Sequence, residues 1–190
     1  TVTHGATLDH VVFRDQTSRV SLAGRLTTQD TRNYVEDQFL GVASRKLAYV
    51  DLAVNALTAV AGGSGNARLA YVKGLSDFGA LKDPDDLPDD LPHAQFRKVT
   101  LDLGFNRSFA LTASQPLLWS SVFSSQYSYD TLYGSQQFLV GGVSSIRGSS
   151  NNTLSGDNGW LWRNEVSLPW QGREDAAGVN GRLYLAYDFG

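Results

Sequence analysis

The side chains that most often perform catalysis are scarce in this chain or lack the partners they need. Cysteine is absent, which excludes a thiol nucleophile, cysteine-ligated zinc and iron–sulfur clusters. The three histidines, His4, His10 and His93, form no H-x-x-x-H or H-E-x-x-H pair that could hold a metal ion. Serine is frequent, but no G-x-S-x-G turn presents one as a nucleophile. The sequence therefore predicts no catalytic residue, no metal site, no cofactor and no small-molecule substrate.

A different chemistry, the pairing of opposite charges, is available in the last third of the chain. Arg147 lies in a polar stretch rich in glycine and serine, which predicts a loop. Asp188 follows on the polar side of an alternating segment. If the loop folds back onto that segment, the two residues can form a bidentate ion pair. Such a pair contributes more when it is partly desolvated than on an open surface.

The elements that must position these charges are β-strands, because apolar residues recur at every second position. In 98–106 the apolar set alternates with polar residues and glycine, which gives the strand one apolar and one polar face. That set consists of Val99, Leu101, Leu103 and Phe105. Similar patterns predict about nine strands, at 8–14, 19–27, 48–56, 66–73, 98–106, 117–127, 137–142, 159–170 and 182–190. The stretch 34–46 is interpreted as a connection followed by the start of a strand.

These strands suit two architectures. In a soluble β-sandwich the apolar faces pack together, whereas in a transmembrane barrel they contact lipid and the polar faces line an aqueous lumen. Aromatic residues near strand ends, such as Trp119, Tyr127 and Trp170, favour the barrel. No run of about 18 apolar residues is present, which excludes a membrane-spanning helix. Periodicity alone leaves sandwich and barrel open.

Net charge and composition bear on the remaining candidate functions, which are nucleic-acid binding and calcium binding, and on the origin of the chain. The formal net charge of -3 argues against nucleic acid as a partner. The segment 79–95 carries three prolines and five aspartates, which predicts a solvated loop. A calcium site is the alternative there, but the D-x-D-x-D-G spacing is missing. The chain also contains no methionine, so we expect a processed product or an internal piece of a longer protein.

One constellation identifies a family. Phe138-Leu139-Val140-Gly141-Gly142 is followed by Val143-Ser144-Ser145-Ile146-Arg147-Gly148, a polar run, and then Gly159-Trp160-Leu161-Trp162-Arg163-Asn164-Glu165. This order of motifs resembles the outer-membrane transporters of two-partner secretion systems, the TpsB group of haemolysin and filamentous-haemagglutinin exporters. In that family a G-G-x-x-S-V-R-G-Y/F motif opens a loop that folds back into the barrel lumen. Later strands carry G-W-x-x-R-N-E and F-x-D-x-G.

The resemblance implies specific site residues. The lumen loop motif is Gly141, Gly142, Ile146, Arg147 and Gly148; the lumen wall contributes Asp188 and Gly190; and the lumen-facing strand contributes Arg163, Asn164 and Glu165. Arg147 at the loop tip is expected to pair with Asp188. Two positions depart from the family pattern, because Ser149 replaces the aromatic residue after R-G and Ala186 replaces the one before the aspartate. The missing ring at 149 leaves the charge pair in place but alters how the loop tip packs.

The resemblance also implies a function and a domain organisation. An unfolded exoprotein partner of haemolysin, haemagglutinin or adhesin type would be recognised by periplasmic POTRA domains and cross the bacterial outer membrane without ATP. Residues 1–190 are then expected to be a piece of the C-terminal barrel domain, without the POTRA domains and terminal strands, because single-chain barrels have an even strand number. The alternatives are a porin or adhesin barrel, a soluble β-sandwich binding module, and an outer-membrane hydrolase using His10 or His93. Nine strands would also place the 79–95 loop on the periplasmic side, opposite the start of the lumen loop.

Overall fold

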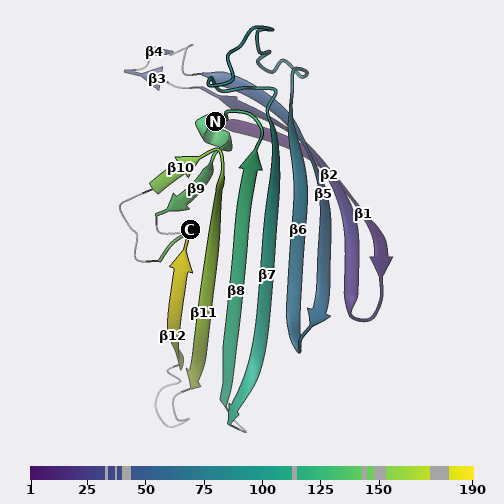
Figure 1. Ribbon diagram of the computed structural model, residues 1–190, viewed down its shortest axis with the longest axis vertical. Coiled ribbons are helices and arrows are strands. Elements are labelled where there is room, and N and C mark those ends of the chain that lie inside the picture. The colour runs from purple at the N-terminus through teal and green to yellow at the C-terminus, as the bar shows by residue number, and fades with distance from the viewer. Residues whose placement is uncertain are drawn as a thin grey trace.

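The computed structural model describes residues 1–32, 34–36, 38–39, 44–112, 115–142, 145–147, 153–171 and 180–190. Eight long antiparallel strands form one curved sheet in the order β1-β2-β5-β6-β7-β8-β11-β12 (Figure 1). Their bounds are β1 Val2–Arg14, β2 Ser18–Thr31, β5 Arg45–Val60, β6 Gly63–Leu75, β7 Arg97–Thr112, β8 Gln115–Ser128, β11 Gly159–Gln171 and β12 Asn180–Phe189. The described residues also form two small hairpins and a 3-10 helix. These are β3 Tyr34–Val35 with β4 Gln38–Phe39, β9 Phe138–Gly141 with β10 Thr153–Gly156, and η2 Gly134–Gln136.

The strands are long enough for a membrane wall. The shortest of the eight, β12, has 10 residues and the longest, β5 and β7, have 16. A tilted transmembrane strand needs about 9 to 11 residues. Each strand pairs with the next long strand along the chain, which is the meander expected of such barrels. The prediction of an all-β antiparallel sheet is confirmed, although the wall contains eight strands.

The register separates the side chains into two faces. Residues directly opposite each other on paired strands share a face, and successive residues alternate. One face is apolar across the whole sheet and carries strongly exposed leucines, among them Leu8, Leu69, Leu183 and Leu185. Aromatic rings on this face contact one another, with centroids 5.3 Å apart for Phe105 and Trp119 and 5.2 Å for Trp162 and Phe189. A continuous exposed apolar face is what a lipid-facing wall requires.

The other face is polar and concave. Its ionised residues include Asp9, Arg19, Arg25, Asp51, Arg68, Lys98, Asp102, Arg163, Glu165, Arg182 and Asp188. Several pair with each other across strands. Arg68 contacts Asp51 at 2.7 Å, and Arg19 contacts Asp9 at 3.3 Å. The described strands therefore have the arrangement predicted for a barrel, with apolar side chains on the outer face and charged side chains on the inner face. In a soluble β-sandwich the apolar face would lie inside.

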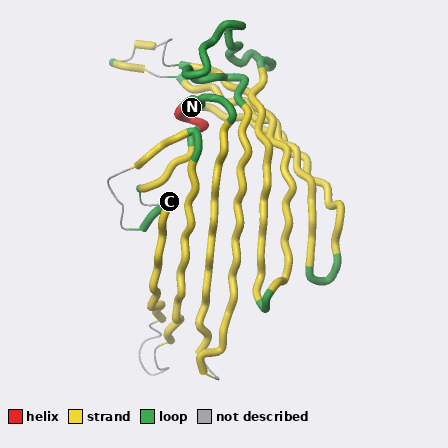
Figure 2. The backbone as a smooth tube through the Cα atoms, viewed as in Figure 1, coloured by secondary structure: helices red, strands yellow, loops and turns green. Residues whose placement is uncertain are grey.

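The interpretation of 137–142 as a wall strand was wrong. Residues Phe138–Gly141 do form a strand, but it pairs with β10 in a separate hairpin beside β11. Without it, β8 is followed in the sheet by β11, and the 76–96 and 129–158 connections start at the same end. Figure 2 shows the described parts of both connections at the top of the sheet, at the opposite end from the turns that join β1 to β2 and β5 to β6. The 79–95 segment therefore does not lie opposite the start of the lumen loop.

That segment is more ordered than a solvated loop. Its aspartates 85, 86, 89 and 90 are exposed as predicted. Asp83 instead turns inward, where its carboxylate accepts the backbone N–H groups of Ala94 and Gln95 at 2.9 and 2.8 Å. Gln95 returns the contact by accepting from the Asp83 N–H at 2.7 Å. The segment is folded into a cap over this end of the sheet. No helix among the described residues is long and apolar enough to cross a membrane.

Candidate functional site

The site is formed by the connection between β8 and β11, which turns back along the sheet. The β9 strand ends at two glycines, Gly141 and Gly142, with φ values of 104° and 74°. This left-handed region strains any residue with a Cβ, so the Gly-Gly pair sets the turn. Ser145 closes the turn, because its hydroxyl oxygen accepts the Gly141 N–H at 2.6 Å. Arg147 follows two residues later, aimed at the polar face of the wall.

Arg147 is held by five hydrogen bonds to the last two strands. Its Nε donates to Asp188 Oδ2 at 2.7 Å, its Nη2 to Asp188 Oδ1 at 2.6 Å, and its backbone N–H to Asp188 Oδ2 at 3.0 Å. Its Nη1 donates to Glu165 Oε2, and Nη2 also reaches the Asn164 carbonyl at 3.1 Å. The Asp188 side chain is only 2% exposed. Fork-to-fork pairing of this kind fixes direction as well as distance.

Two further arginines complete the cluster. Arg163 Nε lies 3.9 Å from Asp188 Oδ2, and Arg182 Nη1 lies 3.1 Å from Glu165 Oε1. Among the described residues, three guanidinium groups thus share two carboxylates, and Arg147 contacts both of them. Hydrogen bonding to Asp188 raises the pKa of Arg147 above its usual range, which keeps it charged at any physiological pH.

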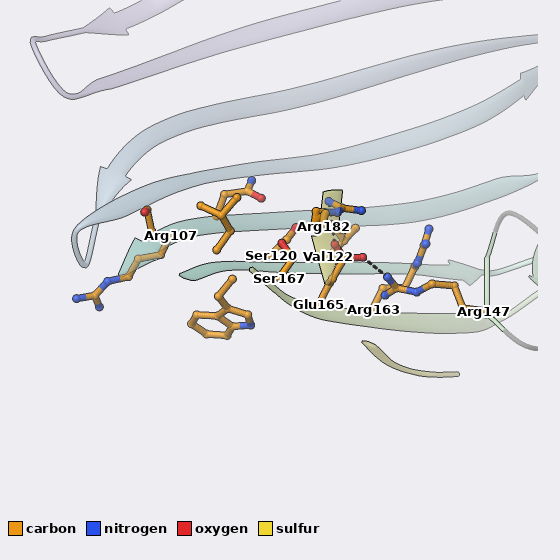
Figure 3. A pocket seen from close by; sticks show the side chains of 12 residues that line it. Arg107, Ser120, Val122, Arg147, Arg163, Glu165, Ser167 and Arg182 are labelled. Atoms are coloured by element: carbon orange, nitrogen blue, oxygen red, sulfur yellow. Dashed lines mark hydrogen bonds and ion pairs between the residues drawn. The ribbon is translucent and has the colours of Figure 1, made fainter. Parts of the chain in front are cut away.

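An open cavity of about 550 Å³ borders the cluster on the concave face. Figure 3 shows Arg147 reaching along the wall toward Glu165, with Arg163, Arg182 and Ser167 around it. Every one of the cluster's carboxylates is already engaged by an arginine, so neither is available as a general base. The arrangement suits the holding of a loop rather than bond chemistry.

The structure brings together most of the residues that the sequence singled out. Arg147, Asp188, Glu165 and Arg163 meet in one cluster, and Ile146 is the half-buried neighbour of Arg147. Gly148 and Ser149 lie outside the described residues. At Gly190 a Cβ would come 2.5 Å from the Trp160 carbonyl oxygen, so only glycine fits where the chain lies against the start of β11.

The assignment of Asn164 to the lumen-facing set was wrong. Asn164 lies opposite Tyr187 in the β11–β12 register, whereas Arg163 lies opposite Asp188 and Glu165 opposite Ala186. Alternation therefore places the Asn164 side chain on the apolar face, and only its main-chain carbonyl meets Arg147. The sequence reasoning missed Arg182. Its position on the polar face of 182–190 was the available signal, because alternation aligns it with Asp188.

The fold and the cluster define a class: a wall segment of a transmembrane β-barrel with a loop folded against its polar face. The model of the family described as "Haemolysin secretion/activation protein ShlB/FhaC/HecB" matches residues 1–190, and the chain belongs to this family. The family consists of transporters and not of enzymes, as predicted.

Similar proteins agree. The chain is 38% identical over 169 residues to the outer membrane transporter CdiB of Dickeya dadantii (strain 3937), covering 89% of this chain and 29% of that protein. It is 32% identical over 164 residues to the hemolysin transporter protein ShlB of Serratia marcescens, covering 86% and 29%. The solved structure of CdiB from Escherichia coli superposes with a TM-score of 0.80 at 31% identity, covering 97% of this chain and 37% of that one. The chain thus spans about three tenths of the length of these curated relatives.

Proposed function

We propose that this chain is part of an outer-membrane pore through which a partner exoprotein of haemolysin, haemagglutinin or adhesin type leaves the cell in a two-partner secretion system. The observation that carries the proposal is the attachment of Arg147 to Asp188 and Glu165 on the polar face of a sheet whose other face is apolar. Family membership supports it, because its relatives include outer membrane and hemolysin transporters.

In this proposal the loop is an anchored element of the pore. The five hydrogen bonds of Arg147 hold the loop along β11 and β12, and so keep it clear of the rest of the concave face. An unfolded polypeptide passes beside it, in contact with the charged wall. Breaking one partner of a desolvated ion pair costs about 3 to 5 kcal/mol, because the other charge is left uncompensated. Loss of Arg147 would therefore release the loop into the path of the exported chain.

We further propose that residues 1–190 are one piece of a larger barrel domain, with POTRA domains and further strands elsewhere in the full-length protein. The order of the sheet supports this, because β1 and β12 form its two edges. An edge strand offers unpaired backbone groups, and a barrel leaves none. The share of the relatives' length that the chain covers points the same way.

The test is secretion by the full-length protein, expressed together with a large exoprotein of haemolysin, haemagglutinin or adhesin type as its cargo. Arg147→Ala is expected to lower the amount of exoprotein in the medium by about tenfold or more, since a tenfold effect corresponds to only about 1.4 kcal/mol. Barrel assembly should persist, as judged by the heat-modifiable migration of the membrane protein on gels. Arg25→Ala is the matched control, because Arg25 lies on the same face and, among the described residues, donates its side-chain hydrogen bond to Thr7 at 3.2 Å and not to the loop.

Two results would contradict the proposal. Wild-type secretion by Arg147→Ala would remove the anchoring role from the loop. Absence of any secreted partner from wild-type cells, with the barrel assembled, would remove the export function itself.

A further inference from the structure

A second polar cluster lies about the start of the loop, away from Arg147. Lys98 Nζ donates to Gln126 Oε1 at 3.0 Å and to the Gln136 carbonyl oxygen at 2.7 Å. Gln126 Nε2 donates to the same carbonyl at 3.1 Å and to the Asp157 carbonyl at 3.0 Å. Lys98, Gln126 and Gln136 are each at most 8% exposed. The cluster therefore fixes one peptide group of η2 from two neighbouring strands, β7 and β8.

The same short segment reaches across the concave face to the other side of the sheet. Gln136 Nε2 donates to Gln29 Oε1 of β2 at 3.3 Å. In the sheet order β5 and β6 lie between β2 and β7, so Gln136 bridges two non-adjacent strands across the concave face. We call this Gln29–Gln136 bridge the chord. Arg45 of β5 adds a third attachment, with its guanidinium 4.4 Å from the ring centroid of Tyr133. Residues 132–136 thus contact the wall on both sides.

The space beneath this chord is filled with apolar side chains. Phe96 and Leu132 are fully buried and contact Val72 of β6, with Tyr49 of β5 packed against them. Gly74 allows this approach, because a Cβ there would collide with the Ala94 carbonyl. This packed layer is the core of the described part of the chain, and the removal of its apolar surface from water stabilises the segment in place.

Lys98 forms no ion pair among the described residues. Its ammonium group donates instead to the side-chain amide oxygen of Gln126 and to the main-chain oxygen of Gln136. Burying an ammonium group is costly unless its hydrogen bonds are made. Displacing η2 would take the Gln136 carbonyl oxygen away from the Lys98 ammonium group and leave that buried charge with one hydrogen bond fewer. This loss is unfavourable and therefore opposes the displacement of η2.

We propose that Lys98 is a positioning residue for the loop: with Gln126 it fixes Gln136, so that segment 132–136 remains a permanent strut across the concave face. The inference rests on the proposed function, in which the loop stays anchored during export. The polypeptide in transit passes beside the strut and does not displace it. The loop then has two attachment points. We call the contact of Gln136 with Lys98 and Gln126 the base, and the contact of Arg147 with Asp188 the tip.

The first experiment removes the donor in the full-length protein, with the same exoprotein cargo as above. Lys98→Met is expected to lower secretion by about tenfold, the effect of a loss near 1.4 kcal/mol, while the barrel still assembles. Lys82→Met is the matched control, because Lys82 is exposed in the cap segment, and it should secrete as the wild type does. Normal secretion by an assembled Lys98→Met protein would overturn the proposal.

The second experiment locks the strut. Gln29→Cys and Gln136→Cys introduce two thiols into a segment without native cysteine, and dibromobimane joins them across the chord. The linked protein should secrete as well as the unlinked one, and linking should restore secretion to Lys98→Met. Loss of secretion on linking would overturn the proposal, since the strut would then have to open.

The yield of linking separates this inference from the proposed function, because it is measured without cargo. It should stay high when the tip is freed by Asp188→Asn, and it should fall in Lys98→Met. An equal fall of the linking yield in both variants would show that the base does not hold without the tip. That result would refute an independent attachment at Lys98, even if export by this protein is confirmed.

Discussion

Neutralising Asp188 is the most direct perturbation of the loop tip. In Asp188→Asn the side chain keeps its shape and one acceptor oxygen, but it loses its charge. Arg147 then retains Glu165 and the Asn164 carbonyl. Because Asp188 is almost fully buried, little water is present to replace the lost charge. The expected result is a loop that leaves the wall more often while the strands remain paired.

The size of the effect follows from the contacts. A complete break of a buried pair costs about 3 to 5 kcal/mol. Here the remaining amide and the partial exposure of Arg147, whose side chain is 26% accessible, reduce the loss to about 2 to 3 kcal/mol. At room temperature this corresponds to a roughly 30- to 150-fold increase in the ratio of released to docked loop.

Trypsin can measure that ratio. Cleavage after Arg147 requires its side chain to leave Asp188 and enter the protease, so the cleavage rate follows the released fraction when opening is fast. Full-length protein in outer-membrane fragments is digested, and the new termini are counted by mass spectrometry relative to cleavage at exposed Lys82. Asp9→Asn, on the same face but in an exposed pair with Arg19, should leave the rate unchanged. A change of less than about threefold in Asp188→Asn would refute the assignment of Asp188 as the main anchor, since it corresponds to well under 1 kcal/mol.

Two further predictions concern the frame of the site. Gly190→Ala should lower the temperature at which the barrel loses heat-modifiable migration, because the added Cβ would clash with the Trp160 carbonyl oxygen. Gly134→Ala is the control and should leave that temperature unchanged, because a Cβ at Gly134 meets nothing within 4 Å. Equal midpoint temperatures for the two variants would contradict the steric argument. The second concerns Asp130, beyond the end of β8, whose pKa is held below its usual value by a hydrogen bond from Arg97. Its stabilising contribution is present above the unfolded value of about 3.9 and is lost as pH falls through the lower folded value. The same midpoint should therefore drop below pH 3.9 more in the wild type than in Asp130→Asn, and parallel curves would exclude this contribution.

The wall was predictable because alternation is a local property. The apolar faces of the long strands are exposed and are not packed against a second layer of protein among the described residues. The alternation along each strand is therefore kept. The separate β9–β10 hairpin was not predictable on the same ground. Its 137–142 segment alternates as a wall strand does, and only pairing with Thr153–Gly156 distinguishes it. The sequence carries no sign of that partner, which lies within the polar run between Gly148 and Gly159.

The site was predictable to the extent that it depends on side chains. Arg147, Asp188 and Glu165 are charges within recognisable motifs, and period two places the last two on one face. Asn164 was misassigned because it was grouped with its motif neighbours, although alternation already placed it among the apolar residues. Lys98 was not recognised because its acceptor is the main-chain carbonyl of Gln136, 38 residues away. Any residue at 136 would supply that oxygen, so no residue type could reveal it.

The hydrogen bond between Gln136 and Gln29 has a consequence for how this sheet folds. Most pairings in the sheet join strands that follow one another, and they can form in order as hairpins. Gln29 and Gln136 are separated by 107 residues and meet only when the strands from β2 to β8 have bent into their final curve. A fluorescent pair at these two positions would therefore report the moment when the growing sheet acquires its curvature, distinct from the earlier pairing of its strands.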